Sequence, residues 1–213
     1  MKSGKRLPPA ARPYRQTARA EAAEATGREI LEVFSDCMRK QWFDEVTLDE
    51  VAGHAGVNVR TVIRRYGGKE GLLKAFVESF VPAVAMNRET PPGDIEAAVE
   101  RLVELYEAWG DSVIRNLAQG PRHPALKPLL DLGRICHRAI TAQAYAPWLE
   151  RLVGLDRRRT LDALVAATDV YVWKLSRRDM GRSRAETAML LRRLVEAVLA
   201  QASTLASNHR SPS

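Results

Sequence analysis

The chain has 213 residues, of which 46% are apolar and 28% charged, so it can bury a core in one large domain or two small ones. Its net charge of +7 would attract nucleic acid or an anionic membrane surface, and the charge alone does not distinguish these two partners. No stretch approaches the roughly 18 to 20 apolar residues that a membrane span requires, and the amino terminus lacks the apolar segment of a secretory signal. We therefore expect a folded protein that stays in the cytoplasm and has no membrane partner.

A basic segment opens the chain. Residues 1–20 contain six Lys or Arg residues, and the first acidic residue is Glu21. Pro8, Pro9 and Pro13 interrupt any helix there, so we predict a flexible arm. The arm could track phosphates or the DNA minor groove, or it could be simply disordered. A membrane-surface helix fits it less well, because its apolar residues are few.

Cysteine and histidine residues give little sign of a disulfide, a metal site or an active site. Cys37 and Cys136 lie far apart in apolar helical patterns, and the four histidines lack ligand spacing. Cys136 and His137 are the only adjacent reactive pair, but neighbours on a helix point about 100° apart and cannot act as nucleophile and base. The sequence contains no glycine-rich phosphate loop, GxSxG or HExxH motif. We expect no enzyme, no cofactor and no metal.

Apolar residues spaced by three and four predict helices throughout the chain. The predicted helices cover residues 21–42, 47–55, 58–66, 69 to about 82, 94–118, 129–146, 161–175 and 183–205. No window shows sustained strand alternation, so we predict an all-α fold of about nine helices.

Specific signals mark several helix starts. Thr47-Leu-Asp-Glu50 and Ser183-Arg-Ala-Glu186 read as capping boxes, in which the hydroxyl and the carboxylate each accept from the other residue's amide. Asn58 is a favourable N-cap, and Gly56 before it can adopt a positive φ without steric cost.

The two short helices joined at Gly56 are predicted to form a helix-turn-helix, with Val51, Val57 and Val62 as their shared core. In such a unit the second helix enters the major groove, and its first residues reach furthest. The side chains predicted to contact DNA from this helix are Asn58, Val59, Arg60, Thr61, Arg64, Arg65 and Tyr66. Thr47 and Lys69 begin helices, whose amino termini offer amides to phosphate oxygens. The alternative is an ordinary pair of helices with a solvated basic face.

Residues 25–80 resemble the DNA-binding domain of the TetR family of bacterial transcriptional regulators. The resemblance includes Phe43, the Ala55-Gly56-Val57 turn, Thr61, Tyr66 and the Lys69-Glu70 pair. Two residues depart from the family pattern: Ile63 replaces a tyrosine that touches the DNA backbone, and Arg65 replaces an aromatic residue or histidine. The resemblance implies a DNA-binding domain at 21–82, an effector-binding and dimerisation domain at 83–206, and leaves a tail at 207–213 that we expect to be disordered.

The family resemblance also implies a homodimer, and the last two predicted helices carry apolar residues on more than one face. Burial within a single chain is the alternative. We expect the interface to use residues 157–177 and 184–205.

The resemblance further implies a pocket for a small-molecule effector between the long helix, the central helices and the penultimate helix. Its candidate lining residues are Tyr106, Trp109, Arg134, His137, Trp148, Asp169 and Trp173. A charge on an apolar helix face needs a partner or water, so Arg134 and Asp169 could instead form structural ion pairs. The expected function is a sequence-specific regulator that binds duplex operator DNA, as a repressor released by its effector. The alternative is a nonspecific nucleoid-type DNA-binding protein without an effector.

Overall fold

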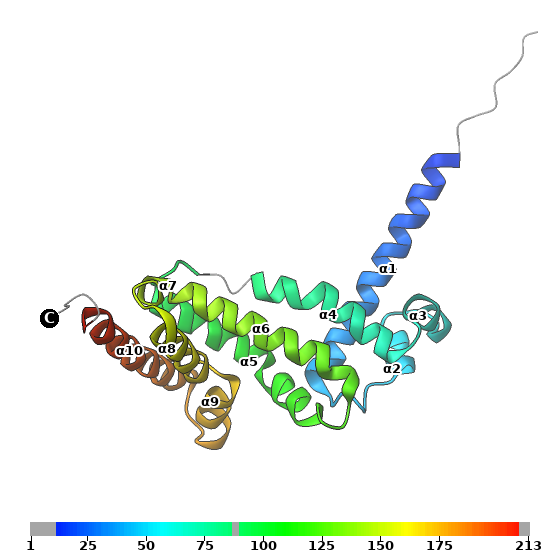
Figure 1. Ribbon diagram of the computed structural model, residues 1–213. Helices are drawn as coiled ribbons and strands as arrows, with labels where there is room; N and C mark the ends of the chain where they lie inside the picture. The colour runs from blue at the N-terminus through cyan, green and yellow to red at the C-terminus, as the bar shows by residue number, and fades with distance from the viewer. Residues whose placement is uncertain (1–11, 87–89, 209–213) are drawn as a thin grey trace, which may run out of the picture.

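The computed structural model of the chain describes residues 12–86 and 90–208. Within these ranges the fold is all-α, as predicted, and no β-strand occurs. None of the described helices is both long enough and apolar enough to span a membrane. The molecule is elongated, with the short helices α2 and α3 near one end and α8 to α10 at the other (Figure 1).

Four helices build the amino-terminal part: α1 (Arg12–Lys40), α2 (Leu48–His54), α3 (Val59–Tyr66) and α4 (Lys69–Met86). They share one apolar core, in which Ile30 and Phe34 of α1 meet Val62 of α3 and Phe76 of α4. Phe34 and Phe76 pack edge to face, with ring centroids 5.8 Å apart. This core fixes the orientation of the two short helices between α1 and α4.

The first helix begins nine residues before its predicted start and takes in part of the predicted flexible arm. The expectation that Pro13 would prevent a helix there is wrong, because α1 starts at Arg12 and Pro13 is its second residue. A proline at this position lacks only an amide that would have no intrahelical partner anyway. Residues 1–11 of the arm lie outside the described residues.

The carboxy-terminal part is formed by α5 (Ile95–Gln119), a 3₁₀ turn (Pro124–Leu126), α6 (Lys127–Ala144), α7 (Ala146–Leu149), α8 (Gly154–Ala167), α9 (Val170–Lys174), a π-helical turn (Leu175–Asp179) and α10 (Arg184–Asn208). Two apolar clusters join these helices: one packs α5 against α9 and α10, and the other packs α8 against α10 and the end of α6. The predicted capping box at the start of α10 is confirmed, since Ser183 and Glu186 exchange backbone-to-side-chain hydrogen bonds of 2.8 and 3.2 Å. Helix α10 extends through Asn208 into the predicted tail, and residues 209–213 lie outside the described residues.

The single helix predicted over residues 161–175 is wrong. Helix α8 ends at Ala167, and α9 starts anew after Asp169, whose carboxylate accepts a hydrogen bond from the Tyr171 amide (2.9 Å). The buried Thr168 hydroxyl donates to the Leu164 carbonyl (2.7 Å). The Asp169 cap starts a new helix, although the apolar spacing continues across the break.

The two parts of the chain meet at the carboxy-terminal half of α5. The Gln119 side chain, only 1% exposed, accepts from the Phe43 amide (2.8 Å) and donates to the Asp44 carboxylate. About two helix turns earlier, the buried Ser112 hydroxyl donates to the Met38 carbonyl at 2.7 Å. Helices α4 and α6 also lie side by side (Figure 1). These contacts make the joint between the two parts a packed, hydrogen-bonded interface.

Candidate DNA-binding site

The turn between α2 and α3 has the predicted geometry. Thr47 caps α2 through a bond from the Glu50 amide (3.1 Å), and Asn58 caps α3 through a bond from the Arg60 amide (2.9 Å). The reciprocal half of the predicted capping box is wrong, because the Glu50 carboxylate accepts from the Gln41 side chain and not from the Thr47 amide. Gly56 has φ of +64°, which L side chains rarely adopt. Val51 and Val62 are fully buried between the two helices. The helix-turn-helix is therefore held by capping at both starts and by a shared apolar core.

The outer face of α3 is basic and partly apolar. Asn58, Arg60, Ile63 and Arg64 are exposed, and Val59 and Thr61 are half-buried. Ile63 is 46% exposed, so this helix presents an aliphatic side chain to solvent between Arg60 and Arg64. Among the residues that the structure describes, neither arginine forms an ion pair, so their guanidinium groups can make bidentate contacts to guanine or to phosphate.

Two of the residues predicted to contact DNA instead hold α3 against α1. The Arg65 guanidinium donates to the Ala23 carbonyl (2.8 Å) and lies across Gly27. The Tyr66 hydroxyl donates to the Gly27 carbonyl (2.9 Å), and Arg65 lies 5.8 Å from the Tyr66 ring centroid. Local sequence patterns do not indicate these contacts, because they join residues about forty positions apart.

Lys69 also has a structural role. Its ammonium donates to the Asp44 carbonyl (3.2 Å) and lies 4.5 Å from the Phe43 ring centroid. Partial burial lowers the pKa of Lys69, against the opposing attraction of Asp44. Lys69 therefore supports the loop before α2, whereas Thr47 remains exposed at the start of α2.

A small cavity lies in the carboxy-terminal part, between α5, α6 and the break before α9. Its volume suits about one water molecule. It is lined by Thr90, Ala98, Leu102, His137, Ile140, Thr141, Ala144, Tyr145 and Thr168. His137 Nε2 lies 3.3 Å from the Val165 carbonyl and 3.3 Å from the Thr168 hydroxyl. Burial raises the pKa of Tyr145 to about 12.

His137 is the one predicted effector residue among those that line this cavity. Tyr106 is buried and donates to the Thr168 carbonyl (3.0 Å), while Trp109 faces the other part of the chain, with Arg39 at 5.4 Å from its ring centroid. Arg134 is exposed and paired with Asp131, as the structural alternative predicted. Trp148 packs beside the cluster of α8 and α10, and Asp169 caps α9.

Trp173 belongs to a network of hydrogen bonds with half-buried charged residues. Its side chain is fully buried, its indole donates to Glu107 (2.9 Å), and Arg178 lies 4.7 Å from its ring centroid. Arg177 also bonds Glu107, and that hydrogen bond is the main cause that holds the pKa of Glu107 below its ordinary value. Trp173 therefore ties α9 to α5.

Thr141 and Tyr145 line the cavity but were missed by the sequence reasoning. They follow His137 by four and eight residues, and residues four apart share one helix face. This spacing could have pointed to them. Gln119 was also missed, because a lone glutamine in a helix carries no pattern.

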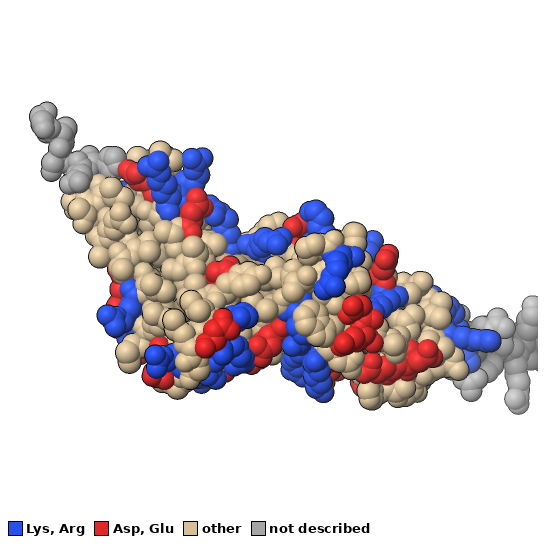
Figure 2. Space-filling view, turned by 90° about the horizontal axis from the view of Figure 1, so that it is seen from below, with Lys and Arg blue, Asp and Glu red and all other residues tan. Residues whose placement is uncertain are grey.

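Apolar side chains are exposed where α8 to α10 meet. Tyr171 (55% exposed), Met189 (61%) and Leu194 (37%) lie on α9 and α10, and Leu155 lies at the start of α8. Figure 2 shows a broad surface without charged residues at the end of the molecule next to the carboxy terminus. Exposed apolar patches of this kind mark association surfaces.

Comparisons with known proteins agree with this geometry. Residues 30–76 match the family model of bacterial regulatory proteins of the tetR family. An uncharacterized HTH-type transcriptional regulator of Mycobacterium bovis is 31% identical over 93 residues, and one of Mycobacterium tuberculosis H37Rv is 30% identical over 93 residues. These alignments cover 43% of this chain and 49% of each relative, so the chain spans about half the length of the curated relatives it matches.

Two solved structures share the fold over most of the chain. One, described as a transcriptional regulator from Pseudomonas aeruginosa PAO1, has a TM-score of 0.62 at 16% identity and aligns with 83% of this chain and 91% of its own. The other, described as a TetR-family regulator from Mesorhizobium loti, has a TM-score of 0.62 at 21% identity and aligns with 84% and 96%. Over residues 30–76, the amino-terminal part of the chain is therefore similar to the bacterial regulatory proteins of the tetR family.

Proposed function

We propose that the chain is a homodimeric, sequence-specific DNA-binding transcriptional regulator of the cytoplasm, and that it acts as a repressor released by a small molecule. The observation that carries the DNA-binding part is the outer face of α3, where Arg60, Ile63 and Arg64 are exposed on a helix whose other face is anchored. Arg65, Tyr66 and Lys69 act in this proposal by holding α3 and the loop before α2.

Selection of duplexes from a random pool, followed by footprinting, tests sequence preference. We expect a roughly palindromic site with half-sites about 34 to 36 Å apart or somewhat more, since a two-fold dimer presents two recognition helices. Binding of all duplexes with equal affinity at fixed salt would favour the nonspecific nucleoid-type alternative.

Single substitutions on α3 test whether its arginines contact base edges or only phosphate groups. Arg60→Ala or Arg64→Ala should cost about 1 to 3 kcal/mol on the selected site and relax the preference at one base pair. Arg101→Ala, which removes a half-buried arginine of α5 that pairs with Glu104, is the control and should leave affinity unchanged. Equal losses on selected and random DNA would mean that the arginines contact only phosphate.

The proposed dimer uses α8 and α10, with the π-helical end of α9 at its edge. Met189 and Leu194 offer the exposed apolar surface that an obligate interface needs. Sedimentation velocity should give a dimer at micromolar concentration, and Met189→Glu combined with Leu194→Glu should give a monomer. A stable wild-type monomer would contradict the proposal.

The proposed effector site is the cavity beside His137, which must widen to accept more than a water molecule. A ligand there would move α6, which packs on α4, and α5, whose Gln119 holds the loop before α2. Both routes reach the helix-turn-helix. We expect a coupling of about 1 to 3 kcal/mol, and operator DNA must weaken the ligand by the same factor.

A thermal-shift screen of small, partly apolar compounds would find ligands, and His137→Ala should abolish the shift. Operator affinity with and without each hit then tests induction. A hit that changes tryptophan fluorescence but leaves operator affinity within twofold would contradict the release mechanism.

A further inference from the structure

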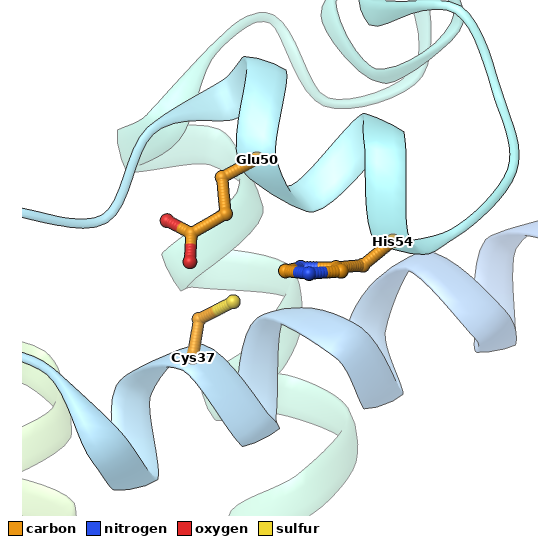
Figure 3. A group of neighbouring side chains, drawn as sticks. All are labelled: Cys37, Glu50 and His54. Carbon is orange, nitrogen blue, oxygen red and sulfur yellow. The ribbon is translucent and has the colours of Figure 1, made fainter.

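Three side chains that can bind metal ions meet where α1 packs on α2. Cys37 comes from α1, whereas Glu50 and His54 come from α2 (Figure 3). One ligand atom from each residue, the Cys37 sulfur, a Glu50 carboxylate oxygen and a His54 ring nitrogen, lies within 4.8 Å of the other two. The linear sequence hides this group, because Cys37 is thirteen residues from Glu50.

The secondary structure explains the convergence. Glu50 and His54 are four residues apart on α2, so they lie one above the other on the same helix face. That face is turned toward α1, where Cys37 is 5% exposed in the core. Cys37 is therefore fixed by packing, while half-buried Glu50 and exposed His54 can adjust their side chains.

The thiol, carboxylate and imidazole groups of this cluster suit transition-metal cations such as zinc better than magnesium or calcium. Thiolate and imidazole ligands favour zinc-type transition cations, whereas magnesium and calcium prefer oxygen ligands alone. Ligand atoms around tetrahedral zinc lie about 3.3 to 3.8 Å apart, given bond lengths of about 2.0 to 2.3 Å. Because the three ligand atoms lie within 4.8 Å of one another, each pair needs to close by no more than about 1.5 Å, which rotation of the Glu50 and His54 side chains can supply.

The surroundings also suit a metal ligand. The Gln41 side-chain amide donates a hydrogen bond to Glu50 Oε1. Hydrogen bonds of this kind orient ligating carboxylates in metal sites. No hydrogen bond from the described part of the chain reaches the second Glu50 oxygen, and the exposed side of His54 leaves an opening through which a cation and a water ligand can enter.

We propose that Cys37, Glu50 and His54 form a binding site for one zinc-type divalent cation, with water as the fourth ligand. The bound cation joins α1 to α2, as Arg65 and Tyr66 join α1 to α3. It therefore fixes both helices of the helix-turn-helix on the same supporting helix. This site is separate from the proposed effector cavity, and its existence does not depend on the effector.

Cobalt(II) titration of the reduced full-length protein, after removal of any purification tag, tests the site. We expect one Co²⁺ per chain, with a thiolate-to-cobalt charge-transfer absorption and the visible bands of tetrahedral cobalt, both removed by Zn²⁺. His54→Gln and Glu50→Gln should weaken binding at least about tenfold, in line with the loss of one of three protein ligands. Cys37→Ser should remove the charge-transfer band.

Two matched variants control for the other cysteine and another histidine. Cys136→Ser and His123→Gln should bind Co²⁺ as the wild type does. Because Cys37 is buried and its substitution can unfold the domain, exposed His54 gives the decisive variant, with folding checked by circular dichroism. Zn²⁺ should raise the melting temperature of the wild type but not of His54→Gln. Absence of a charge-transfer band in the wild type, or equal binding by His54→Gln, would overturn the proposal.

Discussion

Replacing Gln119 by Met is expected to lower the free energy of unfolding by about 1 to 3 kcal/mol. Gln119 is 1% exposed, and its carbonyl oxygen is the acceptor for the buried Phe43 amide at 2.8 Å. Methionine has a similar volume, so the variant creates little cavity. It leaves the Phe43 amide without that acceptor, and the desolvation cost of such a group sets the magnitude.

The same variant removes the hydrogen bond that Gln119 donates to Asp44. Although desolvation works in the opposite direction, this bond and the nearby His123 hold the pKa of Asp44 below its ordinary value of 3.8. A lowered folded-state pKa contributes stability that is present above the ordinary value and is lost as the pH falls through the folded value. The stability difference between wild type and variant should therefore narrow in strong acid, while the contribution of Phe43 remains.

Urea denaturation followed by circular dichroism measures this difference. All samples need the same protein concentration, because unfolding of the proposed dimer would depend on that concentration. Gln143→Met, at an exposed glutamine of α6, is the matched control and should change stability by less than about 0.5 kcal/mol. A Gln119→Met loss below about 0.5 kcal/mol, or an equal loss in the control, would refute the reasoning.

Three further substitutions and one titration test the packing of the fold. Gly110→Ala should destabilise by about 1 to 3 kcal/mol in thermal unfolding, because a Cβ there would lie 2.4 Å from the Trp173 ring. Gly133→Ala, in open space within α6, should instead stabilise by about 0.5 to 1 kcal/mol. Tyr66→Phe should cost about 0.5 to 1.5 kcal/mol by removing the hydroxyl bond to α1, and a change below 0.3 kcal/mol would count against that bond. In an ultraviolet titration, Tyr145 should ionise near pH 12, and its stabilising effect is lost as the pH rises from its ordinary pKa of 10.0 through about 12. Ionisation near pH 10 in the folded state would contradict its burial.

Local sequence determined the helix-turn-helix. The caps at Thr47 and Asn58 and the positive φ at Gly56 depend on residues within a few positions of one another, so their side chains could be interpreted directly. Apolar spacing likewise predicted α5 to within one residue at each end. The capping box at Ser183 located the start of α10 for the same reason.

Tertiary structure decided which polar and aromatic residues are available for binding. Arginine and tyrosine are residue types that often contact DNA, but Arg65 and Tyr66 donate hydrogen bonds to carbonyl groups of α1. Trp173 was predicted to line an effector pocket, but its side chain is fully buried and its indole donates a hydrogen bond to Glu107. The approach of Cys37 to His54 depends on how α1 packs on α2, which no local pattern records. A periodic sequence specifies that a helix has a buried face, but the partner of each side chain on that face is fixed only when the helices pack together.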